Sequence, residues 1–216
     1  MSCVIVAGGQ LDEPLLQHMI PTADVVIAAD RGLEALQRLG IRPHYIIGDF
    51  DSASHETVAS LEDYETMPDV EVIRLCPEKD DTDTEAALQL AFDKSCGDIT
   101  ILGGTGSRLD HVLGNIAVLG QGLERGRSVC LVDAHNRIRM IDRELILDKH
   151  TQYGTYVSVF PYGDRACGVT MDGFYYPLSD ATLEGYNSLG VSNEITAEQG
   201  VIRVKQGALI VIESRD

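Results

Sequence analysis

Two aspartates separated by one residue follow a short apolar run and could do chemistry together. Asp49 and Asp51 come after the run 45–47. Alternate residues of an extended chain share a face, so this pair can present two carboxylates to one cation. Mg²⁺ prefers oxygen ligands and keeps several waters, so one or two carboxylates plus phosphate oxygens suffice to hold it. The same residues also fit a turn at Gly48-Asp49 and a helix cap at Asp51-Ser52, which is the favoured interpretation of this motif taken alone.

A second acidic cluster, residues 79–83, reads Lys-Asp-Asp-Thr-Asp and precedes a helical pattern. Acidic residues are common at helix N-termini because of the backbone dipole, and Thr82 and Glu85 have the spacing of a capping box. Three carboxylates within four residues exceed what capping requires, and they repel one another unless a cation is shared. A metal ion would supply that charge, and Lys79 would act as a point charge toward phosphate oxygens.

A glycine-rich segment, residues 103–111, reads GGTGSRLDH and also precedes a helical pattern. Glycines let a backbone approach a phosphate closely, and the following helix N-terminus offers N–H groups. Arg108 can add a bidentate contact to phosphate oxygens. The segment is not a P-loop, because G-x-x-x-x-G-K-[ST] does not occur in the chain. His111 and Asn115 lie four residues apart on one helix face, although ordinary helix-start polarity is the alternative for Asp110 and His111.

An alternation of short apolar runs and helical segments must position these loops. The runs are rich in Val and Ile, as expected of strands that are buried on both faces. The expected strands are 3–7, 25–29, 45–47, 70–75, 99–102 and 128–132, and the expected helices are 33–39, 82–92 and 109–119. This alternation predicts an α/β fold with an open, mainly parallel sheet and flanking helices.

Each polar loop falls at the carboxyl end of an expected strand, and so does Asp30, which follows the run 25–29. Ligands of open α/β sheets bind beyond the carboxyl ends of the strands. The fold itself should therefore bring the polar loops together at one edge of the sheet. A single acidic loop would mean little, but several that converge predict a site for a metal ion and phosphates.

The sequence changes character after about residue 136. Short alternating runs such as 156–160 and 209–212 are separated by turn signals, and no helix-length periodic stretch appears. This pattern predicts a small antiparallel β domain. We expect an α/β nucleotide-binding catalytic domain over 1–136 and a β-sandwich domain over 137–216, the latter small enough to benefit from a dimer interface.

The composition argues against several classes of partner. Asp and Glu outnumber Lys and Arg by 34 to 17, and the formal net charge of -17 disfavours a nucleic-acid backbone or an anionic membrane surface. No apolar run approaches the roughly 20 residues of a membrane helix, and the start of the chain lacks the basic region of a signal peptide. Five scattered cysteines without a C-x-x-C motif fit reduced thiols. These features predict a soluble, cytoplasmic protein.

Taken together and in order, the motifs resemble those of thiamine pyrophosphokinase (thiamine diphosphokinase) of the bacterial type. The matching segments are IGDFDS at 47–52, KDDTDTEAA at 79–87, GSRLDH at 106–111 and GVSNE at 190–194. The resemblance spans almost the whole chain, and the order of the four motifs is far more specific than any one of them.

The resemblance implies transfer of a diphosphate group from ATP to the hydroxyl of thiamine, with release of AMP. It also implies a homodimer whose active site is shared, because the partner's β domain completes the thiamine pocket. By the same resemblance, the catalytic and Mg²⁺-binding residues are Asp49, Asp51, Asp80 and Asp83. The implied nucleotide-binding residues are Lys79, Thr82, Gly104, Arg108, Asp110 and His111, and the implied substrate-binding residues are Asp30, Ser192 and Asn193.

Two alternatives share part of this pattern. A related diphosphokinase that acts on another hydroxymethyl heterocycle, such as a pterin, would keep the nucleotide and metal motifs and differ in the β-domain pocket, where Ser192-Asn193 favours thiamine. A non-catalytic nucleotide- or vitamin-binding regulator would not need so many carboxylates. The chain has no tryptophan, whereas some family members pack one on the vitamin, and Tyr186 or Phe174 is the candidate for that place.

Overall fold

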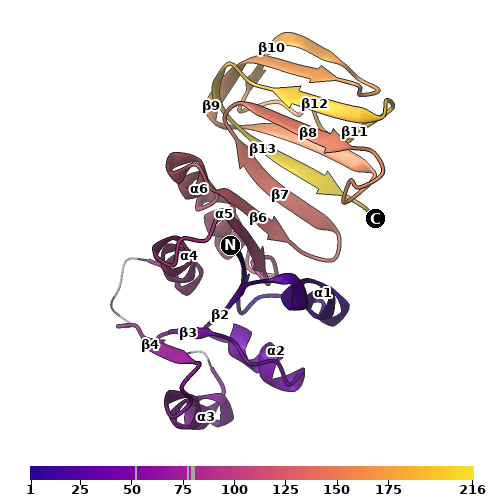
Figure 1. Ribbon diagram of the computed structural model, residues 1–216. Coiled ribbons are helices and arrows are strands. Elements are labelled where there is room, and N and C mark those ends of the chain that lie inside the picture. The colour runs from indigo at the N-terminus through magenta and orange to yellow at the C-terminus, as the bar shows by residue number, and fades with distance from the viewer. Residues whose placement is uncertain (52, 77, 79–80) are drawn as a thin grey trace. The chain divides into compact units, whose positions relative to one another are not determined.

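The computed structural model describes residues 1–216 except 52, 77, 79 and 80 (Figure 1). The chain divides into two compact units, Met1–Ala134 and His135–Asp216. Among the described residues, no helix is long and apolar enough to cross a membrane. The five cysteines are all free thiols.

The first unit is built on a parallel sheet of strands β1 to β6. Their bounds are β1 Ser2–Val6, β2 Val25–Ala29, β3 Tyr45–Gly48, β4 Glu71–Arg74, β5 Asp98–Leu102 and β6 Ser128–Val132. Their spatial order is β4-β3-β2-β1-β5-β6, and every neighbouring pair is parallel. Strand β2 is buried at every position, as expected of an apolar run with helices on both faces. The predicted fold class is confirmed.

The helices of this unit follow the strands as the sequence indicated, with three additional α-helices. Their bounds are α1 Glu13–Met19, a 3-10 turn η1 Ile20–Thr22, α2 Gly32–Arg38, α3 His55–Glu65, α4 Asp83–Asp93, α5 Leu109–Ala117 and α6 Gly120–Arg125. Three helices were not predicted from the sequence: α1 and α6, which are short, and α3, whose charged sequence buries only Thr57 and Leu61. Local caps start α1 and α3: Asp12 Oδ1 accepts from Leu15 N–H at 2.8 Å, and Ser54 Oγ accepts from Thr57 N–H at 3.2 Å.

The strand order reverses direction between β1 and β5. Strands β2, β3 and β4 extend outward on one side of β1, whereas β5 and β6 extend on the other. Because crossovers between parallel strands are right-handed, α1 and α2 cover one face of the sheet and α4 the opposite face, where it packs on β1, β2 and β3 (Figure 1). Such a reversal leaves a crevice between diverging loops at the carboxyl ends of two adjacent strands, which is the usual ligand position in this architecture.

The second unit is antiparallel throughout. Its strands are β7 Asn136–Ile141, β8 Glu144–Asp148, β9 Tyr156–Asp172, β10 Leu178–Glu184, β11 Asn193–Glu194, β12 Gln199–Arg203 and β13 Gln206–Ser214. They are ordered β7-β13-β9-β12-β8, with β10 and β11 also paired to β9. The long strand β9 pairs with β13 through its first part and with β12 and β10 near its end. Gly163 and Gly168, both at positive φ, lie within β9, as expected where a strand passes from one set of partners to another.

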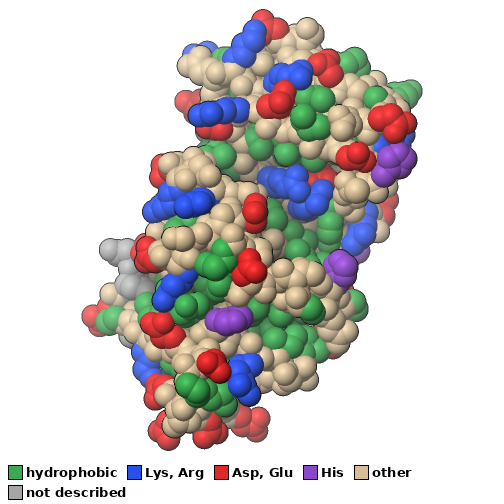
Figure 2. All heavy atoms as spheres, viewed as in Figure 1, with side chains coloured by type: hydrophobic (Ala, Val, Ile, Leu, Met, Phe, Trp, Pro, Cys, Tyr) green, Lys and Arg blue, Asp and Glu red, His purple; other side chains and the backbone are tan. Residues whose placement is uncertain are grey.

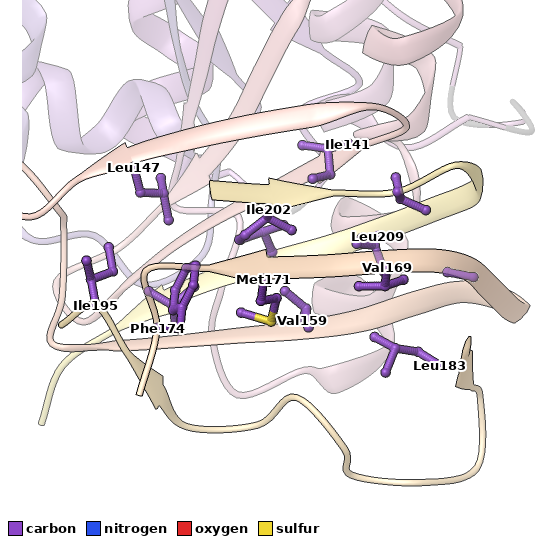
Figure 3. Packing of buried hydrophobic residues seen from close by; sticks show 14 residues of the cluster. Ile141, Leu147, Val159, Val169, Met171, Phe174, Leu183, Ile195, Ile202 and Leu209 are labelled. Carbon is purple, nitrogen blue, oxygen red and sulfur yellow. The ribbon is translucent and has the colours of Figure 1, made fainter. Parts of the chain in front are cut away.

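The core of the second unit consists of aliphatic side chains from several strands together with Phe174 (Figure 3). Val159, Val169 and Met171 come from β9, and Ile202 from β12 packs against them. Phe174 is 5% exposed within this cluster. It therefore serves the core and does not fill the place proposed for a tryptophan against the vitamin, whereas Tyr186 is 94% exposed.

Candidate functional site

A cavity of about 770 Å³ opens at the carboxyl ends of the strands in the first unit. Loops after β1, β2, β3 and β5 line it together with the start of α4 and the first turns of α5. The lining residues used below are Gly9, Gln10, Asp30, Arg31, Asp49, Asp51, Thr82, Asp83, Gly104, Thr105, Gly106, Arg108, His111 and Asn115. The predicted convergence of the polar loops at one edge of the sheet is therefore observed.

Three carboxylates from three different loops meet in this cavity. One oxygen each from Asp30, Asp49 and Asp83 lies within 4.8 Å of the others. Adjacent ligands of an octahedral Mg²⁺ are roughly 3.0 Å apart and opposite ligands roughly 4.2 Å, so a modest movement of the side chains would let these oxygens share one ion. An all-oxygen, triply negative donor set is what a hard divalent cation prefers. Without a cation, the same three charges would repel one another.

The local backbone explains why Asp30 belongs to this group. Asp30 has a left-handed conformation with φ 47 and is 9% exposed. Its N–H donates to the carbonyl of Ile47 at 2.9 Å, which ties it to the end of the neighbouring strand β3. A Cβ on Gly48 would lie 3.1 Å from the Asp30 Cα, so the small residue after β3 lets the two strand ends approach closely.

Asp51 does not belong to the group of three, although its exposed side chain lines the same cavity. The inference that Asp49 and Asp51 share a face assumed an extended backbone. Phe50 instead has φ 59, and the Asp51 N–H donates to Asp49 Oδ1 at 3.2 Å. This left-handed turn interrupts the extended backbone between the two aspartates, and Phe50 packs into the interior, where it is 6% exposed.

The structure describes only residues 81–83 of the second acidic cluster. Lys79 and Asp80 lie outside the described residues. Thr82 caps α4, because its Oγ1 accepts from Glu85 N–H at 3.2 Å, as the capping-box spacing predicted. Asp83 is the first residue of α4, where the helix dipole favours an acidic side chain, and its carboxylate also faces Asp30 and Asp49.

The glycine-rich loop after β5 is held by the loop after β1. The N–H groups of Ala7, Gly9 and Gln10 donate at 2.8–2.9 Å to carbonyl groups within residues 102–105. Gly103 has φ 71, and a Cβ on Gly9 would lie 2.4 Å from the Gly103 carbonyl oxygen. Glycine is thus required on both sides of this contact because the two backbones touch.

Arg108 and Asp110 form a bidentate ion pair at the start of α5, with distances of 3.2 and 2.6 Å. The guanidinium, with further help from the His111 N–H, lowers the pKa of the Asp110 carboxyl to about 2. Both side chains are well exposed. Arg108 and His111 line the cavity, whereas Asp110 contacts Arg108 from outside it, so Asp110 is placed to orient the arginine.

Two residues that line the cavity were not predicted from the sequence as site residues. Arg31 lines the cavity and lies 4.0 Å from Glu34; its position directly after Asp30 in a strand-end loop was the available signal. Asn115, four positions after His111, is a buried polar side chain that also lines the cavity.

Ser192 and Asn193 lie in the second unit and differ in their surroundings. The Asn193 side chain is 2% exposed: its Oδ1 accepts from Tyr176 N–H at 3.0 Å and its Nδ2 donates to the Tyr176 carbonyl at 2.7 Å. Ser192 is exposed with φ 55, and its N–H donates to Ser158 Oγ at 3.0 Å. A cavity of about 230 Å³ beside them is lined by Asn193 and Tyr176.

The excess of acidic residues is not gathered into one patch on the face shown in Figure 2. Acidic and basic side chains are mixed there over both units (Figure 2). Within the described residues, the closest gathering of carboxylates is instead inside the cavity of the first unit. The three carboxylates of the site therefore form a local group within that cavity.

A parallel sheet with an acidic cavity at its switch point, followed by an antiparallel β unit, suits the class of proteins that bind a nucleotide together with a divalent cation. Residues 16–131 match the family model "Thiamin pyrophosphokinase, catalytic domain", and residues 143–209 match "Thiamin pyrophosphokinase, vitamin B1 binding domain". The chain belongs to the thiamin pyrophosphokinase family, as the motifs suggested.

Individual relatives agree with the family models. A thiamine pyrophosphokinase from Bacillus subtilis (strain 168) is 33% identical over 213 residues, covering 98% of each chain. The crystal structure of thiamine pyrophosphokinase from Bacillus subtilis superposes with a TM-score of 0.88 at 32% identity, covering 100% of both chains. That of thiamin pyrophosphokinase from Geobacillus thermodenitrificans has a TM-score of 0.84 at 31% identity, covering 100% of this chain and 98% of the other. The vitamin B1 binding match favours thiamine over a pterin, and the catalytic match favours an enzyme over a regulator.

Proposed function

We propose that this chain transfers a diphosphate group from ATP to the hydroxyl group of thiamine, giving thiamine diphosphate and AMP. The observation that carries this proposal is the convergence of Asp30, Asp49 and Asp83 within 4.8 Å in a cavity that a glycine-rich loop also lines. Carboxylates and a phosphate-accommodating loop in one cavity suit a nucleotide that carries a divalent cation.

The carboxylates fit Mg²⁺, which when bound would neutralise the charge that develops on the phosphate oxygens. We propose Asp49 and Asp83 as its principal ligands, with Asp30 beside them, and we retain Asp51 and Asp80 as candidates. Asp51 is kept as a candidate ligand because it lines the cavity. Asp30 has a second proposed task, because a carboxylate attracts the positive thiazolium ring of thiamine.

The proposed reaction needs little covalent help from the protein. The thiamine hydroxyl oxygen forms a bond to the β-phosphorus, the bond from that phosphorus to the bridging oxygen of AMP breaks, and a site carboxylate accepts the hydroxyl proton. The protein's contribution is to hold the two substrates in line and to balance charge. Arg108 and His111 line the cavity on the side of α5, and we propose that they contact the nucleotide, with Asp110 orienting Arg108.

Three further residues are proposed to contact the nucleotide. Thr82 and Gly104 line the nucleotide cavity, and Lys79 is retained as a phosphate contact. We propose residues 1–136 as the nucleotide domain and 137–216 as the thiamine domain.

Ser192 is exposed and available to the vitamin, whereas the Asn193 amide is bonded to the Tyr176 backbone. Asn193 would thus act largely by shaping the loop. We also propose a cytoplasmic location, where free cysteines are stable.

The proposed activity predicts specific products. Purified protein supplied with ATP, Mg²⁺ and thiamine is expected to release AMP and thiamine diphosphate in equal amounts, because the β-phosphorus is attacked. Chromatography of the nucleotides and of the thiamine products checks this. Release of ADP would contradict diphosphate transfer, and hydroxymethylpterin offered in place of thiamine serves as the substrate control.

A homodimer with a shared site predicts a particle of twice the chain mass of 23.5 kDa. Light scattering at assay concentration is expected to show that mass. Dilution should lower specific activity once the dimer dissociates, since each site would then lack the partner's contribution. A monomer with full specific activity would contradict the shared site and leave the chemistry of the first unit unaffected.

A further inference from the structure

Four successive carbonyl groups in the glycine-rich loop are held by the protein. The backbone N–H groups of Ala7, Gly9 and Gln10 donate to the carbonyls of Leu102, Gly103 and Thr105 at 2.8–2.9 Å. The fourth carbonyl, that of Gly104, accepts a hydrogen bond from Nδ2 of Asn115 at 2.7 Å. A side chain thus completes a row of contacts that is otherwise made by backbone.

Asn115 is well placed to fix that peptide. It lies on α5, four residues after His111, and is 7% exposed. Its partner Gly104 has no Cβ, so the peptide after it rotates with little steric resistance. A buried amide that donates to this carbonyl selects one orientation of the peptide, and breaking the bond would leave a buried polar group without compensation.

The orientation decides which groups face the cavity. Within the described parts of the chain, the N–H groups of Gly104, Thr105 and Gly106 donate no hydrogen bond to the protein. All three residues line the cavity. Successive N–H groups form a favourable surface for phosphate oxygens, whereas a carbonyl turned toward the cavity would place a partial negative charge against them.

We propose that Asn115 is a positioning residue for the nucleotide, whose amide fixes the Gly104 carbonyl in one orientation and so leaves the Thr105 N–H, on the opposite side of the same peptide, available to the phosphates of ATP. This inference rests on the proposed binding of ATP in this cavity. Asn115 acts through the Gly104 peptide and not on the reacting atoms.

The test replaces the amide with an apolar group of similar size. Asn115→Leu is expected to raise the KM for ATP about tenfold or more, since the buried hydrogen bond that fixes the Gly104 peptide is lost. Binding of inorganic tripolyphosphate in the presence of Mg²⁺, measured by calorimetry, should weaken to a similar extent. The KM for thiamine should stay within about twofold, because a local peptide change does not reach the second unit.

Two further variants secure the interpretation. Gln37→Leu removes an amide that donates to Ser60 Oγ at 2.8 Å between α2 and α3, outside the cavity, and it should leave both nucleotide parameters unchanged. Asn115→Ala removes the same donor without filling its space, so it replaces Asn115→Leu if the larger side chain prevents folding. It should reproduce the loss of tripolyphosphate binding.

The binding measurements can contradict the proposed role of Asn115 in three ways. Unchanged ATP and tripolyphosphate binding in a folded Asn115 variant would overturn the inference while leaving the proposed function intact. Weaker ATP binding with unchanged tripolyphosphate binding would also overturn it, because the loop would then serve the nucleoside. Wild-type protein that binds neither ligand would instead refute the placement of ATP in this cavity, and with it the inference.

Discussion

Asp83→Asn is expected to lower turnover by about 100-fold or more while leaving the fold intact, because it removes one of three charges that hold a cation against the phosphates. The amide keeps the size and one oxygen of the carboxylate, so packing at the start of α4 is unchanged. Asp49→Asn should have a comparable effect, since its carboxylate belongs to the same group of three.

The measurement combines steady-state kinetics with thermal unfolding at several Mg²⁺ concentrations. A ligand that binds only the folded state raises the melting temperature, so Mg²⁺ should stabilise the wild-type protein and have little effect on Asp83→Asn. Asp93→Asn is the matched control: it makes the same charge change at the other end of α4, on a residue that does not line the cavity. Wild-type turnover in folded Asp83→Asn would remove Asp83 from the proposed metal site.

Gly32→Ala is expected to destabilise the first unit by about 3 kcal/mol or more, although alanine is the better helix former. A Cβ at Gly32 would lie 1.8 Å from the Val6 carbonyl oxygen and 2.6 Å from its carbon. Because both atoms are backbone at the end of β1, no side-chain rotation relieves the collision. Strand β1 or helix α2 must move, and Asp30 lies only two residues before the first residue of this helix.

Urea unfolding of the variant measures the effect, and a second helical glycine provides the control. Gly114 lies in α5, and a Cβ there would meet nothing within 4 Å. Gly114→Ala should therefore stabilise the protein by about 0.5–1 kcal/mol. If the two variants shifted the unfolding midpoint equally, the need for glycine at position 32 could not be attributed to the close approach of β1 and α2.

Much of the fold could be predicted because its signals are local. The apolar runs that became β1, β2, β5 and β6 are continuous, and α4 begins where Thr82 offers a capping oxygen. Helix α3 could not be found in this way, because its contact with the sheet rests on little more than Leu61. A helix with one buried turn leaves no periodic pattern to read.

The position of the candidate site could be predicted from the sequence, whereas the roles of its individual residues could not. Its loops follow successive strands, and parallel strands end at one edge of a sheet, so their convergence follows from the β/α alternation alone. Whether Ser192 and Asn193 act directly was not readable, since the bonds from Asn193 to Tyr176 join residues 17 apart.

The arrangement of the carboxylates that could do chemistry thus depends partly on the sequence and partly on the tertiary structure. The sequence by itself determined that aspartates lie at strand ends near a glycine-rich loop, because residue order and the strand–helix alternation dictate those positions. Only the tertiary structure decided that Asp30 joins Asp49 and Asp83 while Asp51 stands apart, because left-handed conformations at Asp30 and Phe50 set the direction of each side chain. Asp30 also approaches Gly48 of the neighbouring strand closely, and such a contact between residues far apart in the sequence leaves no local pattern.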